Sequence, residues 1–295
     1  MPTLTPGKLA RILPKNWPED VPYLYAPRHS PALTGSQLAA IRVPPAQPAS
    51  GAAVVAVPHN LRRGPCAAVQ IRTITDPRHP AVGQRGLFAA RRLEPGALIL
   101  PYLGEVHPGT VGVDDDAEHQ PQQQHSHAES DYDLWLSRDA DVAVDAARCG
   151  NEARFVNDYR GVPGAERANA EFREVWDPRP QPRPRPGSCG PPGGCGAAAN
   201  ESPSVHATGE WTMAVFVLPV GKKALAKQQQ KQQQQKRGQR LGVVAGGGRR
   251  ERPLGGINEG EEILVSYGKG FWEKRKQEDE ARSQEEQEQV QEALP

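Results

Sequence analysis

The sequence has few cysteines, few aromatic residues and no long apolar run. Its four cysteines include no CxxC pair, which disfavours a disulfide framework or a structural zinc site and fits reduced thiols. The longest apolar runs, at 97–100 and 213–218, are far shorter than the about 20 residues of a membrane-spanning helix. The N-terminal segment also lacks the apolar stretch of a secretory signal. We therefore expect an intracellular protein without a membrane segment.

Charge of one sign is also missing. The 36 Lys and Arg residues nearly balance 35 Asp and Glu residues and leave a formal net charge of +1. This balance argues against nucleic-acid binding over the whole surface and leaves only local patches. The basic, Gln-rich segment 222–250 is one such patch, and it could contact nucleic acid or act as a nuclear address. We favour a solvated loop and do not expect direct nucleic-acid binding.

Glycine and proline, in contrast, are abundant, with 30 of each among 295 residues, and the apolar fraction is only 37%. Such a composition predicts a folded core interrupted by low-complexity insertions. We assign residues 1–66 to a Pro/Ala-rich N-terminal arm with a short helix near 35–42, residues 67–272 to the folded domain, and residues 273–295 to a charged helix or tail. The insertions are predicted at about 108–129, 177–208 and 221–256.

Short β-like runs, punctuated by Gly and Pro, fill the predicted domain. No helical segments separate these runs, so a doubly wound parallel sheet is disfavoured. The sequence instead predicts a mainly β fold with several small sheets and short helices. The runs lie at 67–74, 86–93, 97–106, 131–136, 141–146, 170–176, 212–220 and 261–267.

The first insertion contains acidic residues and histidines that could be read as metal ligands. Its Gln-rich composition is more typical of solvated coil, so we predict no metal site. The residues concerned are Asp114, Asp115, Asp116, His119, His125 and His127.

Two stretches with special glycines stand early in the domain. GQRGLF (83–88) is a glycine turn that leads into a strand, and such a turn allows the backbone to approach a ligand closely. YLGE (102–105) is the end of a strand followed by a turn. Each stretch alone is weak evidence for a site.

Two later stretches mix apolar and polar residues. GNEARFVND (150–158) sets Phe155 and Val156 directly before Asn157, and a polar residue belongs in a core only when its hydrogen bonds are satisfied. GEEILVSYGKGFW (260–272) is a strand that ends at Tyr267. Such stretches either end an element or place a residue in a site.

Taken together and in this order, the four stretches resemble the SET domain family of S-adenosylmethionine-dependent protein lysine methyltransferases. The resemblance covers roughly residues 70–272 without the insertions, and the combination is specific although each stretch alone is not. It implies a β-clip fold, the SET fold. In that fold small sheets surround a knot-like crossing, where the third stretch threads under the loop made by the fourth.

The resemblance also implies a set of site residues. Tyr267 would be the catalytic tyrosine, and Tyr132 and Val265 would line the channel for the substrate lysine. Asn157 would meet the cofactor S-adenosylmethionine, since a buried amide can donate to a carboxylate and accept from an ammonium group. The predicted cofactor-binding residues are Gln84, Arg85, Gly86, Leu87, Asn157, the backbone of Asp158, and Trp272.

The sequence departs from the family pattern at several points. Asp158 replaces the usual His, so any role of an imidazole there is lost, and Gln84 stands where a second glycine is common. The Cys-rich zinc segments of many members are missing. Phe271 and Trp272 could replace the lid that such a segment builds, or they could be plain core aromatics. Tyr132 is equally consistent with an ordinary half-buried strand residue.

The resulting hypothesis is a protein lysine N-methyltransferase, with a histone or another nuclear protein as substrate and a nuclear or nucleocytoplasmic location. The alternative is a non-catalytic SET-type module that binds a peptide or partner. The presence of both Asn157 and Tyr267 favours the enzyme, because a binding module has no need for that pair.

Overall fold

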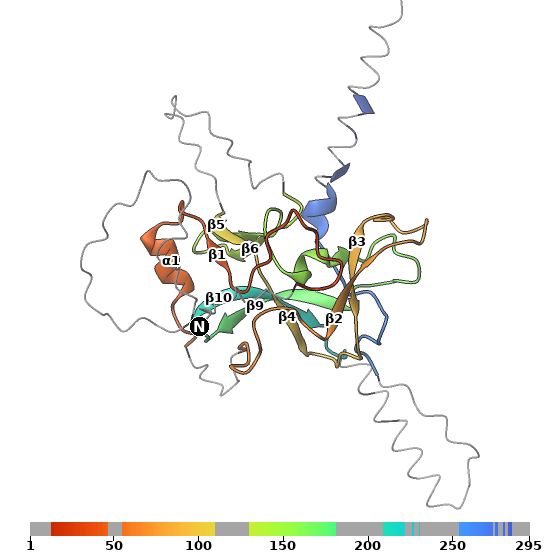
Figure 1. Cartoon of the computed structure of the whole chain (residues 1–295), viewed down its shortest axis with the longest axis horizontal. Helices are drawn as coiled ribbons and strands as arrows, with labels where there is room; N and C mark the ends of the chain where they lie inside the picture. The colour runs from red at the N-terminus through yellow and green to blue at the C-terminus, as the bar shows by residue number, and fades with distance from the viewer. Residues whose placement is uncertain are drawn as a thin grey trace, which may run out of the picture.

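The structure is a computed structural model. It describes residues 13–46, 55–109, 130–180, 209–221 and 254–273, with residues 226, 230, 275, 276, 280, 283 and 284. The described part is mainly β, with several small sheets and few helices, which confirms the predicted fold class (Figure 1). No helix in the described part is long and apolar enough to cross a membrane.

The largest sheet has four strands in the order β1-β5-β7-β6. Strand β1 runs parallel to β5, and the remaining pairs are antiparallel. All four residues of β7 are buried, which explains why its sequence VAVD is almost continuously apolar. The strands are β1 (Arg28–His29), β5 (Glu105–Pro108), β6 (Asp133–Ser137) and β7 (Val142–Asp145).

A second sheet has the order β4-β10-β9 and is antiparallel throughout. Strand β10 lies in the centre, and seven of its eight residues are buried. The strands are β4 (Leu98–Tyr102), β9 (Ala170–Asp177) and β10 (Glu210–Val217). This sheet therefore supplies much of the core.

The predicted run 97–106 divides into two strands that belong to different sheets, β4 and β5. The chain turns between them at Gly104, where an added Cβ would lie 2.3 Å from the carbonyl oxygen of Asp145. Only glycine permits this close approach of the two backbones.

Two small sheets complete the β structure of the described residues. Strands β2 (Val69–Thr73) and β3 (Arg85–Ala89) form an antiparallel pair. Strands β8 (Asn157–Asp158) and β11 (Leu264–Val265) form a parallel pair between segments more than a hundred residues apart. The expected meeting of the third and fourth stretches of the sequence is thus present.

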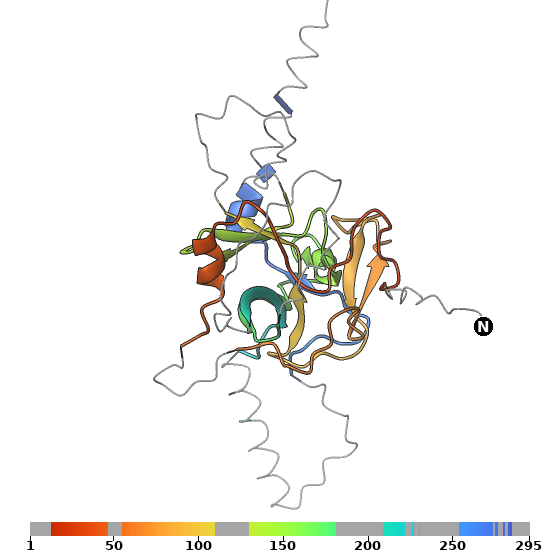
Figure 2. The ribbon, with the colours of Figure 1, turned by 60° about the vertical axis from the view of Figure 1, so that its left-hand side comes forward.

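The described helices are short. Helix α1 (Gly35–Ile41) confirms the helix predicted near 35–42, and a capping box of Thr34 and Gln37 begins it. The 3-10 helix η2 (Glu152–Phe155) directly precedes β8. Residues 269–273, just after β11, are also helical. Figures 1 and 2 place α1 and the β2–β3 pair on opposite sides of the molecule.

The main core includes residues from the segment that the sequence assigned to an N-terminal arm. Trp17 and Tyr23 are buried, and the Trp17 ring lies 4.9 Å from that of Tyr23 and 5.6 Å from that of Phe155. The Tyr23 hydroxyl donates to the buried carboxylate of Glu152 at 2.8 Å. The N-terminal segment therefore packs directly against η2, the element that leads into β8.

Candidate functional site

The parallel pair β8–β11 positions the two residues on which the sequence hypothesis depends. Its register aligns Leu264 with Asn157 and Val265 with Asp158. The side chains of Leu264 and Val265 are buried and hold β11 in the core. Tyr267 follows two residues later, so the chain delivers its phenol beside the end of η2.

Tyr267 is fixed at both its side chain and its backbone. Its hydroxyl donates to the carbonyl oxygen of Val156 at 2.7 Å, and its backbone N–H donates to Asp158 Oδ2 at 2.7 Å. Its ring packs edge-on against Phe271, at 4.9 Å between centroids. Burial, with Tyr132 and Asp158 nearby, raises the pKa of Tyr267. The phenol is therefore neutral at physiological pH.

Asp158 connects the two strands. Its carboxylate accepts from the backbone N–H of Arg160 at 2.8 Å and from Arg160 Nη1 at 2.9 Å, in addition to Tyr267. The residue is 8% exposed. A buried carboxylate with three donors is well satisfied, and here it takes the role of a tether rather than that of an imidazole.

The amide of Asn157 contacts Glu262, which in turn contacts His79, and neither residue was a predicted site residue. Asn157 Nδ2 donates to Glu262 Oε1 at 2.9 Å, and His79 Nε2 lies 3.1 Å from Glu262 Oε2. Glu262 lies 105 positions after Asn157 and 183 positions after His79 along the chain. No local pattern could have indicated the contacts, although Glu262 lies in the quoted GEEILVSY stretch.

A cavity of about 600 Å³ opens beside Tyr267 and Asn157. It also contains Arg154, whose guanidinium donates to the carbonyls of Ala146 and Ala147 and lies 4.6 Å from the ring centre of Tyr132. The sequence-predicted residues that line this cavity are Gln84, Arg85, Tyr132, Asn157, Asp158, Tyr267 and Trp272. We call it the Tyr267 cavity.

Three predicted site residues do not line the Tyr267 cavity. Leu87 and Val265 are fully buried side chains in the core, and the Leu87 carbonyl accepts from the Ile263 N–H at 2.8 Å. Gly86 is buried next to Glu262 and Asn157. Any contact of these three residues with a ligand would be through their backbone or through a neighbour.

One wall of the Tyr267 cavity is aromatic. Phe271 and Trp272 pack edge-on against each other at 5.4 Å, and the Arg160 guanidinium lies 5.9 Å from the Trp272 ring centre. Trp272 Nε1 is buried and has no hydrogen-bond partner among the described residues. A buried indole N–H without a partner is unusual and indicates a donor that is available to a ligand.

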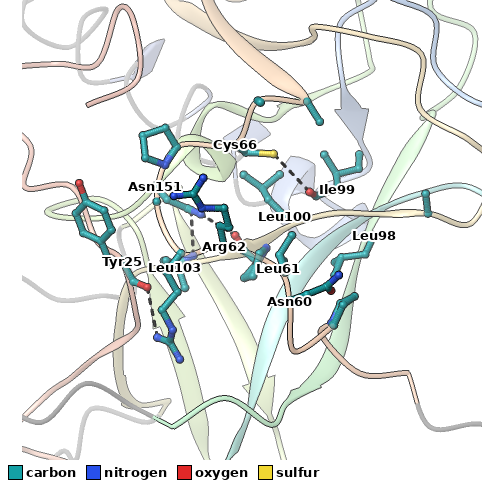
Figure 3. Close-up of a pocket in the computed structure, with 18 of the residues that line it drawn as sticks. Tyr25, Asn60, Leu61, Arg62, Cys66, Leu98, Ile99, Leu100, Leu103 and Asn151 are labelled. Atoms are coloured by element: carbon teal, nitrogen blue, oxygen red, sulfur yellow. Dashed lines mark hydrogen bonds between the residues drawn. The ribbon is translucent and has the colours of Figure 1, made fainter. Parts of the chain in front are cut away.

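A second cavity, of about 930 Å³, lies along β4 and contains none of the predicted site residues (Figure 3). We call it the β4 cavity. Its polar groups are largely occupied by backbone partners: Asn151 Nδ2 donates to the Pro101 carbonyl at 2.9 Å and Asn151 Oδ1 accepts from the Leu103 N–H at 3.2 Å. The Cys66 thiol points to the Ile99 carbonyl at 3.7 Å, and burial raises its pKa.

Within the described part of the chain, no three His, Cys, Asp or Glu side chains are arranged to hold a metal ion. The acidic and histidine residues between 114 and 127 lie outside the described residues. Of the four cysteines, Cys66 and Cys149 are described, and both are free thiols.

No family model and no curated protein matches this chain. Among solved structures, the Chaetomium thermophilum polycomb repressive complex 2 is 19% identical with a TM-score of 0.35, covering 71% of this chain and 16% of that chain. A structure of ctPRC2 in an autoinhibited conformation bound to S-adenosylmethionine is 20% identical with a TM-score of 0.35, covering 70% and 16%. This chain thus spans about a sixth of the length of those solved chains.

Proposed function

We propose that this chain is an S-adenosylmethionine-dependent protein lysine N-methyltransferase whose active site is the Tyr267 cavity. The observation that carries the proposal is the pairing of β8 with β11, which brings Asn157 and Tyr267 from distant segments to one cavity. The resemblance of the sequence to the SET domain family implies the same meeting.

The residues around the cavity fit an adenosyl cofactor with an amino-acid group. Trp272 offers an aromatic face and an unpartnered N–H, and Gln84 and Arg85 enter from the glycine turn. Asn157 Oδ1 makes no hydrogen bond within the described part of the chain, so it can accept from an ammonium group. S-adenosylmethionine, when bound, supplies a methyl group on a sulfonium centre.

In this proposal, the role of Tyr267 is to orient the reacting groups. Its hydroxyl proton is engaged by the Val156 carbonyl, so the lone pairs of the phenol oxygen remain to orient an incoming amine. The raised pKa of Tyr267 makes a phenolate costly, which disfavours it as the group that deprotonates the lysine.

The substrate lysine has to lose its proton before it can attack a methyl group. With a pKa near 10.4, neutralising it at pH 7 costs roughly 4–5 kcal/mol. A partly buried channel lowers this cost by disfavouring the charged amine. Tyr132 lines the cavity, and the arginine stacked on its ring keeps that wall in place. A histone or other nuclear protein is the proposed substrate, with a nuclear or nucleocytoplasmic location.

The test begins with calorimetric titration of the full chain with S-adenosylmethionine and its product S-adenosylhomocysteine. A panel of histone peptides and a nuclear extract are then incubated with labelled cofactor, and mass spectrometry locates the modified residue. We expect cofactor binding and a methylated lysine. Binding without labelling would favour the non-catalytic alternative, and absence of binding at high micromolar concentration would reject the proposal.

A further inference from the structure

Asn157, Glu262 and His79 form a hydrogen-bonded chain at the edge of the Tyr267 cavity, in which His79 is buried and the other two residues are partly buried. His79 is 6% exposed, and the Glu262 side chain is 9% exposed. One carboxylate oxygen of Glu262 accepts from Asn157 Nδ2 at 2.9 Å, and the other lies 3.1 Å from His79 Nε2. Each member of this chain comes from a different segment of the sequence.

The direction of each bond follows from the chemistry of the groups. The backbone N–H of Ala81 donates to His79 Nδ1 at 3.0 Å, so that nitrogen is an acceptor and the ring proton is on Nε2. His79 Nε2–H therefore donates to Glu262. An ionised carboxylate can only accept, so Asn157 has to present its NH₂ group to Glu262. The Asn157 carbonyl oxygen is consequently the end of the amide that remains for the cavity.

The side chain of Asn169 holds the backbone at Glu262 in place. Asn169 Nδ2 donates to the Glu262 carbonyl at 2.7 Å, while Asn169 Oδ1 accepts from the Leu264 N–H at 2.8 Å. Gly86 lies close to the same carboxylate: a Cβ added at Gly86 would lie 2.6 Å from Glu262 Oε1 and 3.2 Å from Asn157 Nδ2. The glycine of the turn thus leaves room for the contact between Glu262 and Asn157.

We propose that Glu262, supported by His79, is a positioning residue that fixes the orientation of the Asn157 amide. Asn157 Oδ1, rather than Nδ2, then meets the ammonium group of the cofactor, and the negative charge behind it favours that cation further. This inference rests on the proposed function. In this proposal Gly86 makes no direct contact with the ligand. Its role is to leave space for the hydrogen bond between Glu262 and Asn157.

The substitution Glu262→Gln tests the inference because it keeps the shape of the side chain. It replaces a carboxylate, which only accepts hydrogen bonds, by an amide, which also donates them. A glutamine can satisfy His79 only with its oxygen, which turns its NH₂ toward Asn157 and makes the Asn157 amide reverse. We measure the affinity of the full chain for S-adenosylhomocysteine and for its deamino analogue, which lacks only the ammonium group. Glu262→Gln should weaken S-adenosylhomocysteine binding by about tenfold or more and leave binding of the deamino analogue nearly unchanged.

The matched control is Glu259→Gln, the same change at an exposed residue three positions earlier in the chain. It should alter neither affinity. His79→Ala, like Glu262→Gln, should lower the affinity for S-adenosylhomocysteine more than that for the deamino analogue. The loss should be smaller than for Glu262→Gln, since Glu262 keeps its bond with Asn157. Equal losses of affinity for both ligands, or no loss for either, would overturn the inference.

A second measurement needs no cofactor. Proton–nitrogen NMR spectra of the His79 ring should show a neutral imidazole with its proton on Nε2 in the native chain. A proton on Nδ1 would overturn the inference whether or not a cofactor binds. Failure of the native chain to bind S-adenosylhomocysteine, with the Nε2–H form present, would reject the proposed function and leave the hydrogen-bonded chain established.

Discussion

The Tyr267 cavity and the β4 cavity differ in what their polar groups do. In the β4 cavity, Asn151 bonds to the backbone through both ends of its amide, and the thiol of Cys66 points to a carbonyl. In the Tyr267 cavity, Asn157 uses one end of its amide, and Trp272 keeps a buried N–H without a partner in the described part of the chain. Two asparagines on either side of η2 thus have opposite roles.

This difference separates a structural site from a candidate active site. The β4 cavity is the larger of the two, yet the amide of Asn151 in it is fully used in hydrogen bonds to the backbone of Pro101 and Leu103. The Tyr267 cavity is smaller, and in it Glu262 holds Asn157 Nδ2 while Asn157 Oδ1 makes no hydrogen bond within the described part of the chain. Volume alone therefore does not select the Tyr267 cavity, whereas the accounting of donors and acceptors favours it as the candidate site.

The strongest test of the comparison is to make the same change in both cavities. Tyr267→Phe should lower the methyl-transfer rate by about 100- to 1,000-fold, because a preorganised hydroxyl at the reacting groups is removed. Its melting temperature should change little, since the lost bond to Val156 contributes about 1 kcal/mol. Initial rates with labelled cofactor measure the effect. Tyr25→Phe, at the β4 cavity, should keep the native rate, and similar rates for both variants would contradict the comparison.

Packing beneath the β4 cavity should matter for stability alone. Leu100 is 3% exposed on β4, and Leu100→Ala should lower the free energy of unfolding by about 3 kcal/mol. Urea denaturation measures this loss. At a temperature where the variant is folded, its affinity for S-adenosylhomocysteine should equal that of the native chain. A selective loss of cofactor affinity would show that the β4 cavity is part of the binding site.

The tether at Asp158 should affect both stability and activity. Asp158→Ala leaves the Tyr267 N–H and two donors of Arg160 without their acceptor, which should cost about 2 kcal/mol of unfolding free energy and also reduce the rate. Asp158→Asn keeps an acceptor oxygen and should recover part of both losses. Urea denaturation and rate measurements on the two variants check this, and an alanine variant of native stability would exclude the tether.

A smaller, pH-dependent effect is expected on the sheet beside the Tyr267 cavity. Burial disfavours the charged form of His107, but the hydrogen bond and charge of Asp133, with the Pro108 carbonyl, outweigh it and raise the pKa of His107. The folded pKa then exceeds the unfolded one, so this stabilisation is full below the unfolded pKa and is lost as pH rises through the folded pKa. Unfolding free energy should therefore fall with increasing pH above about 6.5, and His107→Gln should remove that slope.

Much of the fold could be predicted because several strands and a helix form where local sequence patterns favour them. The apolar runs at 170–176 and 212–220 became β9 and β10, and the short helix predicted near 35–42 became α1. The division of 97–106 into β4 and β5 could not be predicted. It depends on the close approach of Gly104 to the backbone of Asp145, which is a contact across the fold.

Most residues of the candidate site that could be predicted from the sequence stand in one of the four quoted stretches. Asn157 and Tyr267 stand in the quoted stretches, and the structure brings them to one cavity. His79 stands in no motif, yet it lines the Tyr267 cavity and hydrogen-bonds Glu262, 183 positions away. The tether at Asp158 was likewise hidden, because the sequence shows the loss of an imidazole and not the gain of an acceptor for the Tyr267 N–H.

Hydrogen exchange of the full chain with and without S-adenosylhomocysteine tests the central claim most directly. The claim is that residues 154–158 and 264–272 form one cofactor site. Binding should slow exchange of the backbone amides in both segments together and leave 97–103, along the β4 cavity, unchanged. Protection confined to 97–103, or to only one of the two segments, would contradict the account.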